Sequence, residues 1–173
     1  LATSIVGLHN SINTKVEGEI LYNNQNLVKL TDTQFNKLRG NDIGFIFQDP
    51  LSALNPLMRI GDQIEEGLIY HTKLNRVQRE NRVLELLDQV GIPNVQRVAK
   101  QFPHQLSGGM RQRVMIAIAL SGKPAIIIAD EPTTALDVTI QAQILDLLKS
   151  LQDEIQSGII LITHDLGVVA EVA

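Results

Sequence analysis

The sequence contains no cysteine and no tryptophan, and aromatic residues make up only 3% of its 173 residues. Without cysteine the chain can form neither disulfides nor thiolate metal sites. Few aromatic rings are available to stack on bases. Lys and Arg number 15 against 19 Asp and Glu, a net charge of −4, and the basic residues form no cluster. These features argue against nucleic acid as the main ligand.

Long apolar runs are also missing, although 44% of the residues are hydrophobic. No stretch approaches the roughly 18 residues of a membrane-spanning helix. The length suits one domain with a substantial buried core. We therefore expect any membrane role of this chain to act through a partner protein.

Short apolar segments alternate with helical patterns along the chain. We expect buried strands at 43–47, 125–129 and 159–163, and helices at 60–70, 77–90, 109–120 and from Asp137 to about 151. Strands that alternate with helices indicate parallel pairing. The sequence therefore predicts an α/β fold with a partial parallel sheet flanked by helices. Residues 1–49 and 106–173 would form the core that contains the sheet, and residues 50–105 an inserted α-helical subdomain.

The N-terminal part shows local signals of its own. Residues 1–8 resemble the end of a helix that stops near Gly7, and residues 18–27 predict a hairpin that turns at Asn23-Asn24. Thr31 and Gln34 form a capping box for a short helix. At the other end, residues 168–173 again have a helical pattern.

Polar side chains follow each of the three expected strands. Asp130 and Glu131 come directly after 125–129, His164 follows 159–163, and Gln48 follows 43–47. Open parallel sheets bind their ligands at the carboxyl ends of their strands. We therefore expect these side chains to meet at one edge of the sheet.

A second set of candidate residues stands at the start of an expected helix. Ser107, Gly108 and Gly109 open the helical run 109–120. The first N–H groups of a helix are free and its dipole is positive there, which favours an anion such as a phosphate. Glycines let the backbone approach that anion without a Cβ.

Taken together, these motifs resemble the nucleotide-binding subunit of an ABC transporter, which has a P-loop NTPase-type fold. Residues 106–113 (LSGGMRQR) match the family signature, residues 126–131 (IIIADE) its Walker B strand, and residues 132–137 (PTTALD) its D-loop. The resemblance implies ATP and Mg²⁺ as cofactors and a dimer as the working unit. In that dimer, Ser107, Gly108 and Gly109 would face the ATP of the opposite subunit.

The resemblance also implies a role for each polar residue at the strand ends. Asp130 would help to hold Mg²⁺, and Gln48 would reach both Mg²⁺ and the attacking water. Glu131 would orient or deprotonate that water. His164 would hydrogen-bond the γ-phosphate, and Asp137 would lie at the dimer seam.

One family motif is absent from the sequence as given. No G-x-x-x-x-G-K-[ST] loop occurs, and residues 122–124 do not supply it, because Pro124 stands in place of the hydroxyl residue. We expect this Walker A segment shortly before Leu1 and further strands after Ala173. The full-length form is expected to be an ATPase, whereas these 173 residues alone are expected to bind Mg-ATP poorly and to be inactive.

Segments 49–56, 136–143 and 163–170 resemble the peptide and nickel importers within the family. They imply an ATP-hydrolysing subunit that energises uptake of di- or oligopeptides from the cytoplasmic face of the membrane. The implied partners are a second nucleotide-binding subunit, identical or paralogous, membrane permease subunits contacted through the loop after Gln48, and indirectly an extracytoplasmic substrate-binding protein. No nucleic acid is expected.

The sequence leaves other functions open. Nickel or glutathione is an alternative cargo, and a non-catalytic half could supply its signature motif to a partner's ATP. A DNA-repair or chromosome-maintenance ATPase shares the same head, but such proteins carry long coiled coils. Residues 60–90 are far too short for these and show no sustained heptads.

Overall fold

A parallel sheet forms the centre of the molecule. The computed structural model describes residues 2–8, 16–134, 136–165 and 167–169. Strands β3 (Ile43–Ile46), β4 (Ile126–Asp130) and β5 (Gly158–Ile162) pair in the order β3-β4-β5, and both pairings are parallel. The predicted α/β class with a parallel sheet is confirmed.

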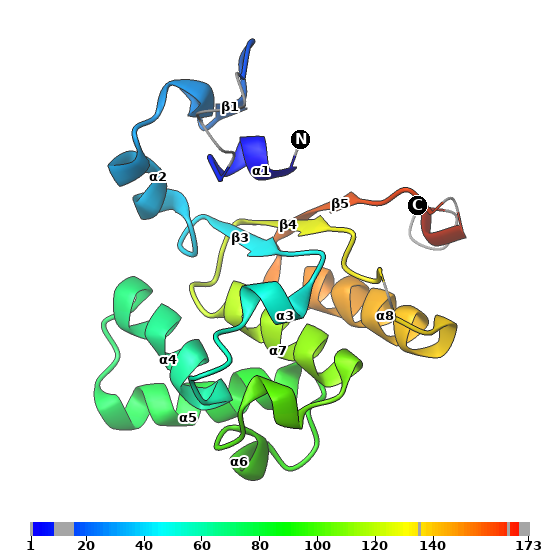
Figure 1. The fold of residues 1–173 in the computed structure, drawn as a ribbon. Coiled ribbons are helices and arrows are strands. Elements are labelled where there is room, and N and C mark those ends of the chain that lie inside the picture. The colour runs from blue at the N-terminus through cyan, green and yellow to red at the C-terminus, as the bar shows by residue number, and fades with distance from the viewer. Residues whose placement is uncertain (1, 9–15, 135, 166, 170–173) are drawn as a thin grey trace.

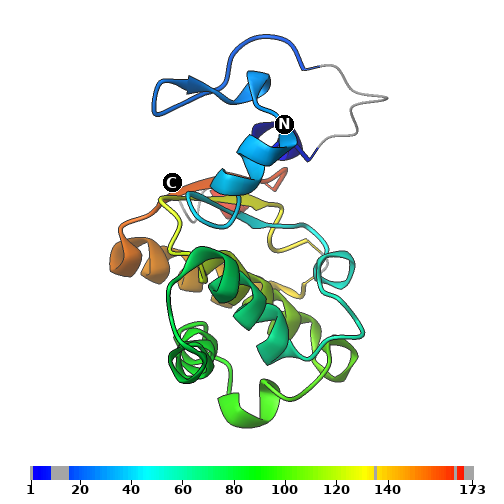
Figure 2. The ribbon, with the colours of Figure 1, turned by 90° about the vertical axis from the view of Figure 1, so that its left-hand side faces the viewer.

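Helices cover both faces of this sheet (Figure 1). On one face lie α7 (Gly108–Leu120) and α8 (Val138–Ile155), with α3 (Pro50–Ala53) beside α7. On the far side of α7 lie α4 (Ile60–His71), α5 (Arg76–Gln89) and the short α6 (Val95–Val98). The opposite face carries α1 (Ala2–Ile5) and α2 (Asp32–Leu38), and Figure 2 shows the same layers from the side.

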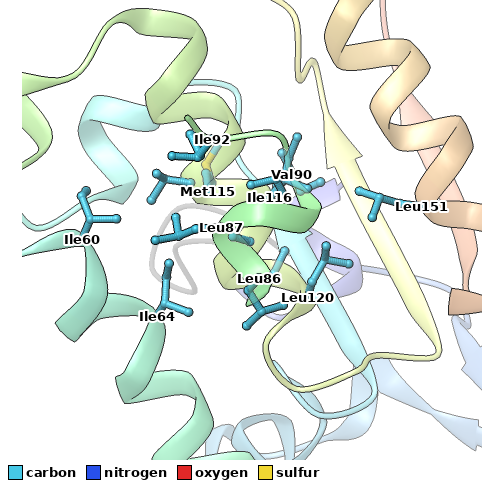
Figure 3. Close-up of a cluster of buried hydrophobic side chains, with 14 of the residues drawn as sticks. Ile60, Ile64, Leu86, Leu87, Val90, Ile92, Met115, Ile116, Leu120 and Leu151 are labelled. Atoms are coloured by element: carbon cyan, nitrogen blue, oxygen red, sulfur yellow. The ribbon is translucent and has the colours of Figure 1, made fainter. Parts of the chain in front are cut away.

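The larger core lies around α7. Val114, Ile116 and Ala117 of this helix are fully buried, as are Leu86 and Leu87 of α5. Figure 3 shows these two helices meeting α4 through their leucine and isoleucine side chains. A helix with neighbours on all sides needs apolar residues all round rather than one apolar stripe. That burial fixes where α7 begins, and hence where Ser107 is placed.

A smaller core covers the other face of the sheet. Phe35, Leu27 and Val6 pack there against Ile43 and Ile128. Successive residues of a strand point to opposite faces, so Ile127 of β4 enters the larger core while Ile128 enters the smaller one. The expectation that this strand is buried on both faces is confirmed.

Strand β5 differs from the expected buried strand. Gly158 is exposed and Ile160 is 43% exposed, because within the described residues β5 pairs with β4 alone. Strand β3 is shorter than expected, since Phe47 lies outside it and is exposed. As a result, Gln48 and His164 are the second residues after β3 and β5, and Asp130 is the last residue of β4 rather than the first residue after it.

The N-terminal signals produce the expected local structures. Strands β1 (Leu21–Tyr22) and β2 (Gln25–Asn26) pair as an antiparallel hairpin, followed by the 3-10 turn η1 (Leu27–Lys29). Asn23 and Asn24 both have positive φ, as a two-residue hairpin turn of the primed type requires. The predicted capping box of α2 forms between Thr31 and Gln34.

Most helix bounds lie within a residue of those expected, and two segments differ. Helix α8 runs four residues further than Leu151, to Ile155. The break expected at Asp49-Pro50 is the start of α3, because the Asp49 side chain accepts a hydrogen bond from the Leu51 N–H and Pro50 suits a first helical turn. A second 3-10 turn, η2 (Pro103–Gln105), precedes α7. Of the helix expected at 168–173, residues 170–173 lie outside the described part.

One glycine after α7 allows two loops to touch. A Cβ on Gly122 would overlap the carbonyl oxygen of Gly40, which is backbone and cannot rotate away. We predict that Gly122→Ala lowers the free energy of unfolding by about 1–3 kcal/mol, as overpacking does. Chemical denaturation measures this change. The matched control is Gly158→Ala, whose Cβ would have its nearest neighbours at 3.9 Å. Equal stability of the two variants would contradict the prediction.

Candidate active site at the ends of the parallel strands

The carboxyl ends of the three parallel strands bring four polar residues to one edge of the sheet. Asp130 is the last residue of β4 and pairs with Ile162 of β5. The N–H of Glu131 donates to the carbonyl oxygen of Ile162 at 2.8 Å, which extends the pairing by one bond. Gln48 and His164 are the second residues after β3 and β5. The edge expected from the sequence is therefore present.

Glu131 is the centre of a hydrogen-bond network. Its Oε2 accepts from Gln48 Nε2 at 2.8 Å and from Thr134 Oγ1 at 2.9 Å. Its Oε1 lies 2.9 Å from His164 Nδ1. These partners come from the ends of β3 and β5 and from the loop that follows β4. The carboxylate thus joins all three strands of the sheet.

A tight turn holds Glu131 at this position. Glu131 has φ +48°, in the left-handed region that few non-glycine residues adopt. The N–H of Thr134 donates to the carbonyl oxygen of Glu131 at 3.1 Å and closes a turn with Pro132 at its second position. The chain therefore reverses at once after β4. The carboxylate stays at the edge, with its side chain 23% exposed.

The network stabilises the charged form of Glu131. The hydrogen bond with His164, and next the one from Thr134, hold the pKa of this carboxyl below its ordinary value, against the opposing effect of desolvation. Glu131 is therefore ionised at neutral pH. An ionised carboxylate at this edge of the sheet can accept a proton from a water molecule.

Asp130 and Gln48 offer the chemistry that a magnesium site needs. Mg²⁺ prefers oxygen ligands and is usually held by one or two carboxylates together with phosphate oxygens and water. Asp130 supplies a carboxylate, and Gln48 retains its amide oxygen because its nitrogen bonds Glu131. Within the described residues no group of three or more His, Cys, Asp or Glu side chains could hold a metal alone. The donor set fits an ion that a nucleotide helps to bind.

The signature residues lie at the start of α7, where Ser107 is the N-cap. Its hydroxyl accepts a hydrogen bond from the Met110 N–H at 3.3 Å, and the residue is exposed. Among the described residues, a Cβ on Gly108 would have only Leu136 within 4 Å, at 3.7 Å. A Cβ on Gly109 would come within 2.8 Å of Ile140 on α8. Gly109 therefore has a packing reason to be glycine that sequence reasoning missed.

Asp137 is the N-cap of α8, at the residue from which the sequence predicts this helix to run. Its side chain accepts a hydrogen bond from the Ile140 N–H at 3.0 Å. The sequence places Thr134 only in the loop, although its hydroxyl contacts Glu131. The signal that could have identified it is its position three residues after Glu131 with Pro132 between them, the spacing of a closed turn.

The family model for the ABC transporter matches residues 1–134 of the chain. This chain belongs to the ABC transporter family. An oligopeptide transport ATP-binding protein, OppD, of Lactococcus lactis subsp. cremoris is 60% identical over 173 residues, 100% of this chain and 51% of the relative. OppD of Bacillus subtilis is 56% identical over 156 residues, 90% of this chain and 44% of the relative. The chain thus spans about half the length of the curated relatives it matches.

Solved ABC cassettes share the fold. The ATP-binding cassette MJ0796, in a dimeric post-hydrolysis state bound to ADP and Pi, gives a TM-score of 0.78 at 37% identity over 91% of this chain and 67% of that one. CbiO1 from Clostridium perfringens, part of an ABC transporter complex, gives 0.79 at 30% identity over 99% and 64%. The P-loop NTPase-type fold expected from the motifs is confirmed.

We predict that His164→Ala raises the pKa of Glu131 towards the ordinary glutamate value, because the largest stabilisation of the anion is lost. Carboxyl ¹³C NMR of the nucleotide-free protein follows the titration of Glu131 directly. His71→Ala is the control, since His71 lies in α4, outside the network. An unchanged Glu131 titration in His164→Ala would show that this histidine does not stabilise the carboxylate.

Proposed function

We propose that the complete protein hydrolyses ATP to drive the import of peptides. The observation that carries this proposal is the carboxylate of Glu131 directly after β4, hydrogen-bonded by side chains that follow β3 and β5. The relatives named as oligopeptide transport ATP-binding proteins favour peptides over nickel or glutathione as cargo. They also favour a transport ATPase over a regulatory half or a DNA-repair ATPase.

Each residue of the edge receives one role in this proposal. Glu131 orients the attacking water and takes its proton, while Asp130 and the amide oxygen of Gln48 hold Mg²⁺. His164 hydrogen-bonds the γ-phosphate, and its 74% exposed side chain is accessible for that contact. The bound Mg²⁺ supplies charge neutralisation at the transferred phosphoryl group.

The start of α7 serves a second subunit. Ser107, Gly108 and Gly109 present the free N–H groups of a 13-residue helix towards phosphate, and we assign them to the ATP of the opposite subunit. Asp137, exposed at the start of α8, would lie at the same seam. The dimeric state of the cassette MJ0796 supports this arrangement.

We predict that Glu131→Gln in the complete protein lowers kcat for ATP by about 10²–10⁴-fold, the usual contribution of a general base. ATP binding is retained, because the amide keeps nearly the same volume and one acceptor oxygen. Steady-state hydrolysis and calorimetric ATP binding measure the two properties separately. Hydrolysis at the wild-type rate by this variant would contradict the assignment of Glu131.

The loop after Gln48 has the character of a docking surface for the membrane subunits. Leu51 and Leu57 are exposed, Leu57 by 86%. The loop backbone is nevertheless fixed, because the buried amide of Gln63 bonds both backbone groups of Asn55 and the carbonyl of Met58. No helix of the described part is both long and apolar enough to cross a bilayer. We propose that these leucines dock on permease subunits at the cytoplasmic face of the membrane, and that the substrate-binding protein acts through the permease.

We predict that Leu57→Asp weakens binding to the permease subunits by at least about tenfold, since an apolar anchor contributes about 2 kcal/mol or more. Co-purification from membranes and titration of detergent-solubilised permease measure this binding. Val77→Asp, which charges another exposed apolar side chain on α5, is the matched control. Equal binding by both variants would rule out Leu57 as an anchor.

A further inference from the structure

We propose that Thr134 is a positioning residue for Glu131: its hydroxyl fixes the orientation of the carboxylate so that one oxygen is left to the attacking water. This proposal rests on the proposed function, in which Glu131 is the general base. It assigns a role to a residue that neither the motif spacing nor the resemblance singled out.

Thr134 holds Glu131 at two points. Its N–H donates to the carbonyl oxygen of Glu131 at 3.1 Å, and its Oγ1 donates to Oε2 at 2.9 Å. The first bond closes the turn and keeps the two residues close, and the second joins their side chains. The side chain of threonine is branched at Cβ and stiff at χ1, which limits how far the hydroxyl can swing.

The other two partners of Glu131 come from other strands of the sheet. Gln48 and His164 belong to the ends of β3 and β5, and both are assigned to the nucleotide and its metal. Any contact that they make there competes with their bonds to Glu131. The Thr134 bond lies within one turn, so it is kept when the neighbouring strand ends rearrange.

The division of the two carboxylate oxygens follows from these bonds. Thr134 and Gln48 both donate to Oε2, while Oε1 is bonded by His164. When His164 turns to the γ-phosphate, Oε1 becomes free to accept a hydrogen bond from water.

The test uses the complete protein in its transporter complex with three variants. Thr134→Val removes the hydroxyl at nearly constant shape, and Thr134→Ser retains it. Thr139→Val makes the same change at an exposed threonine of α8 as a matched control. The dependence of kcat and KM for ATP on pH is measured for each, together with the carboxyl NMR titration of Glu131 in the nucleotide-free protein.

We expect Thr134→Val to lower kcat by about 10-fold or more, as loss of one hydrogen bond to a charged group implies, with little change in KM. The acid limb of its kcat profile and the Glu131 titration both move to higher pH, because a carboxylate that loses a donor is protonated more easily. Thr134→Ser restores the wild-type profile. Thr139→Val leaves the acid limb where it is in the wild type.

Several results would overturn the proposal. A wild-type acid limb and Glu131 titration in Thr134→Val would show that the hydroxyl does not act on Glu131. Equal losses of kcat in the valine and serine variants, without a shift of the limb, would show a purely structural role. A wild-type complex that hydrolyses no ATP would refute the proposed function instead, and the NMR titration would then still decide whether Thr134 acts on Glu131.

Discussion

The parallel pairing of β4 with β3 and β5 is the constraint on which the candidate site depends. Gln48 and His164 lie 116 residues apart in the sequence. The strand pairing nevertheless brings both to the carboxylate of Glu131. The pairing is secured by burial, since Ile127 enters one core and Ile128 the other. Loss of either core would therefore separate the side chains that the sheet assembles.

The second functional surface depends on α7 in a similar way. Because this helix is enclosed by the sheet and by α4, α5 and α8, its first turn has little freedom. Gly109 contacts Ile140 in the first turn of α8, the helix that Asp137 caps. The start of α7 is thus packed closely against the start of α8.

The sequence predicted the strands, the longer helices and the meeting of Glu131, Gln48 and His164, because periodic burial and parallel pairing follow from local patterns. It could not predict that β5 is half exposed, since exposure depends on which strands pair beside it. It could not predict which hydrogen bonds hold the carboxylate of Glu131. Pro132 indicates a turn after Glu131, but the left-handed backbone at Glu131 and the hydroxyl bond from Thr134 depend on the geometry of the folded chain. The same holds for Gly109, whose constraint comes from Ile140 on another helix.

The most direct test of the central claim is a structure of the complete protein with Mg²⁺ and a non-hydrolysable ATP analogue. We expect Glu131 to keep its bond to Thr134 and to lie about 2.6–3.2 Å from a water placed in line with the γ-phosphate. His164 would have left Oε1 of Glu131 for that phosphate. A γ-phosphate bound away from the edge of the sheet, with Glu131 still bonded to both Gln48 and His164, would contradict the account.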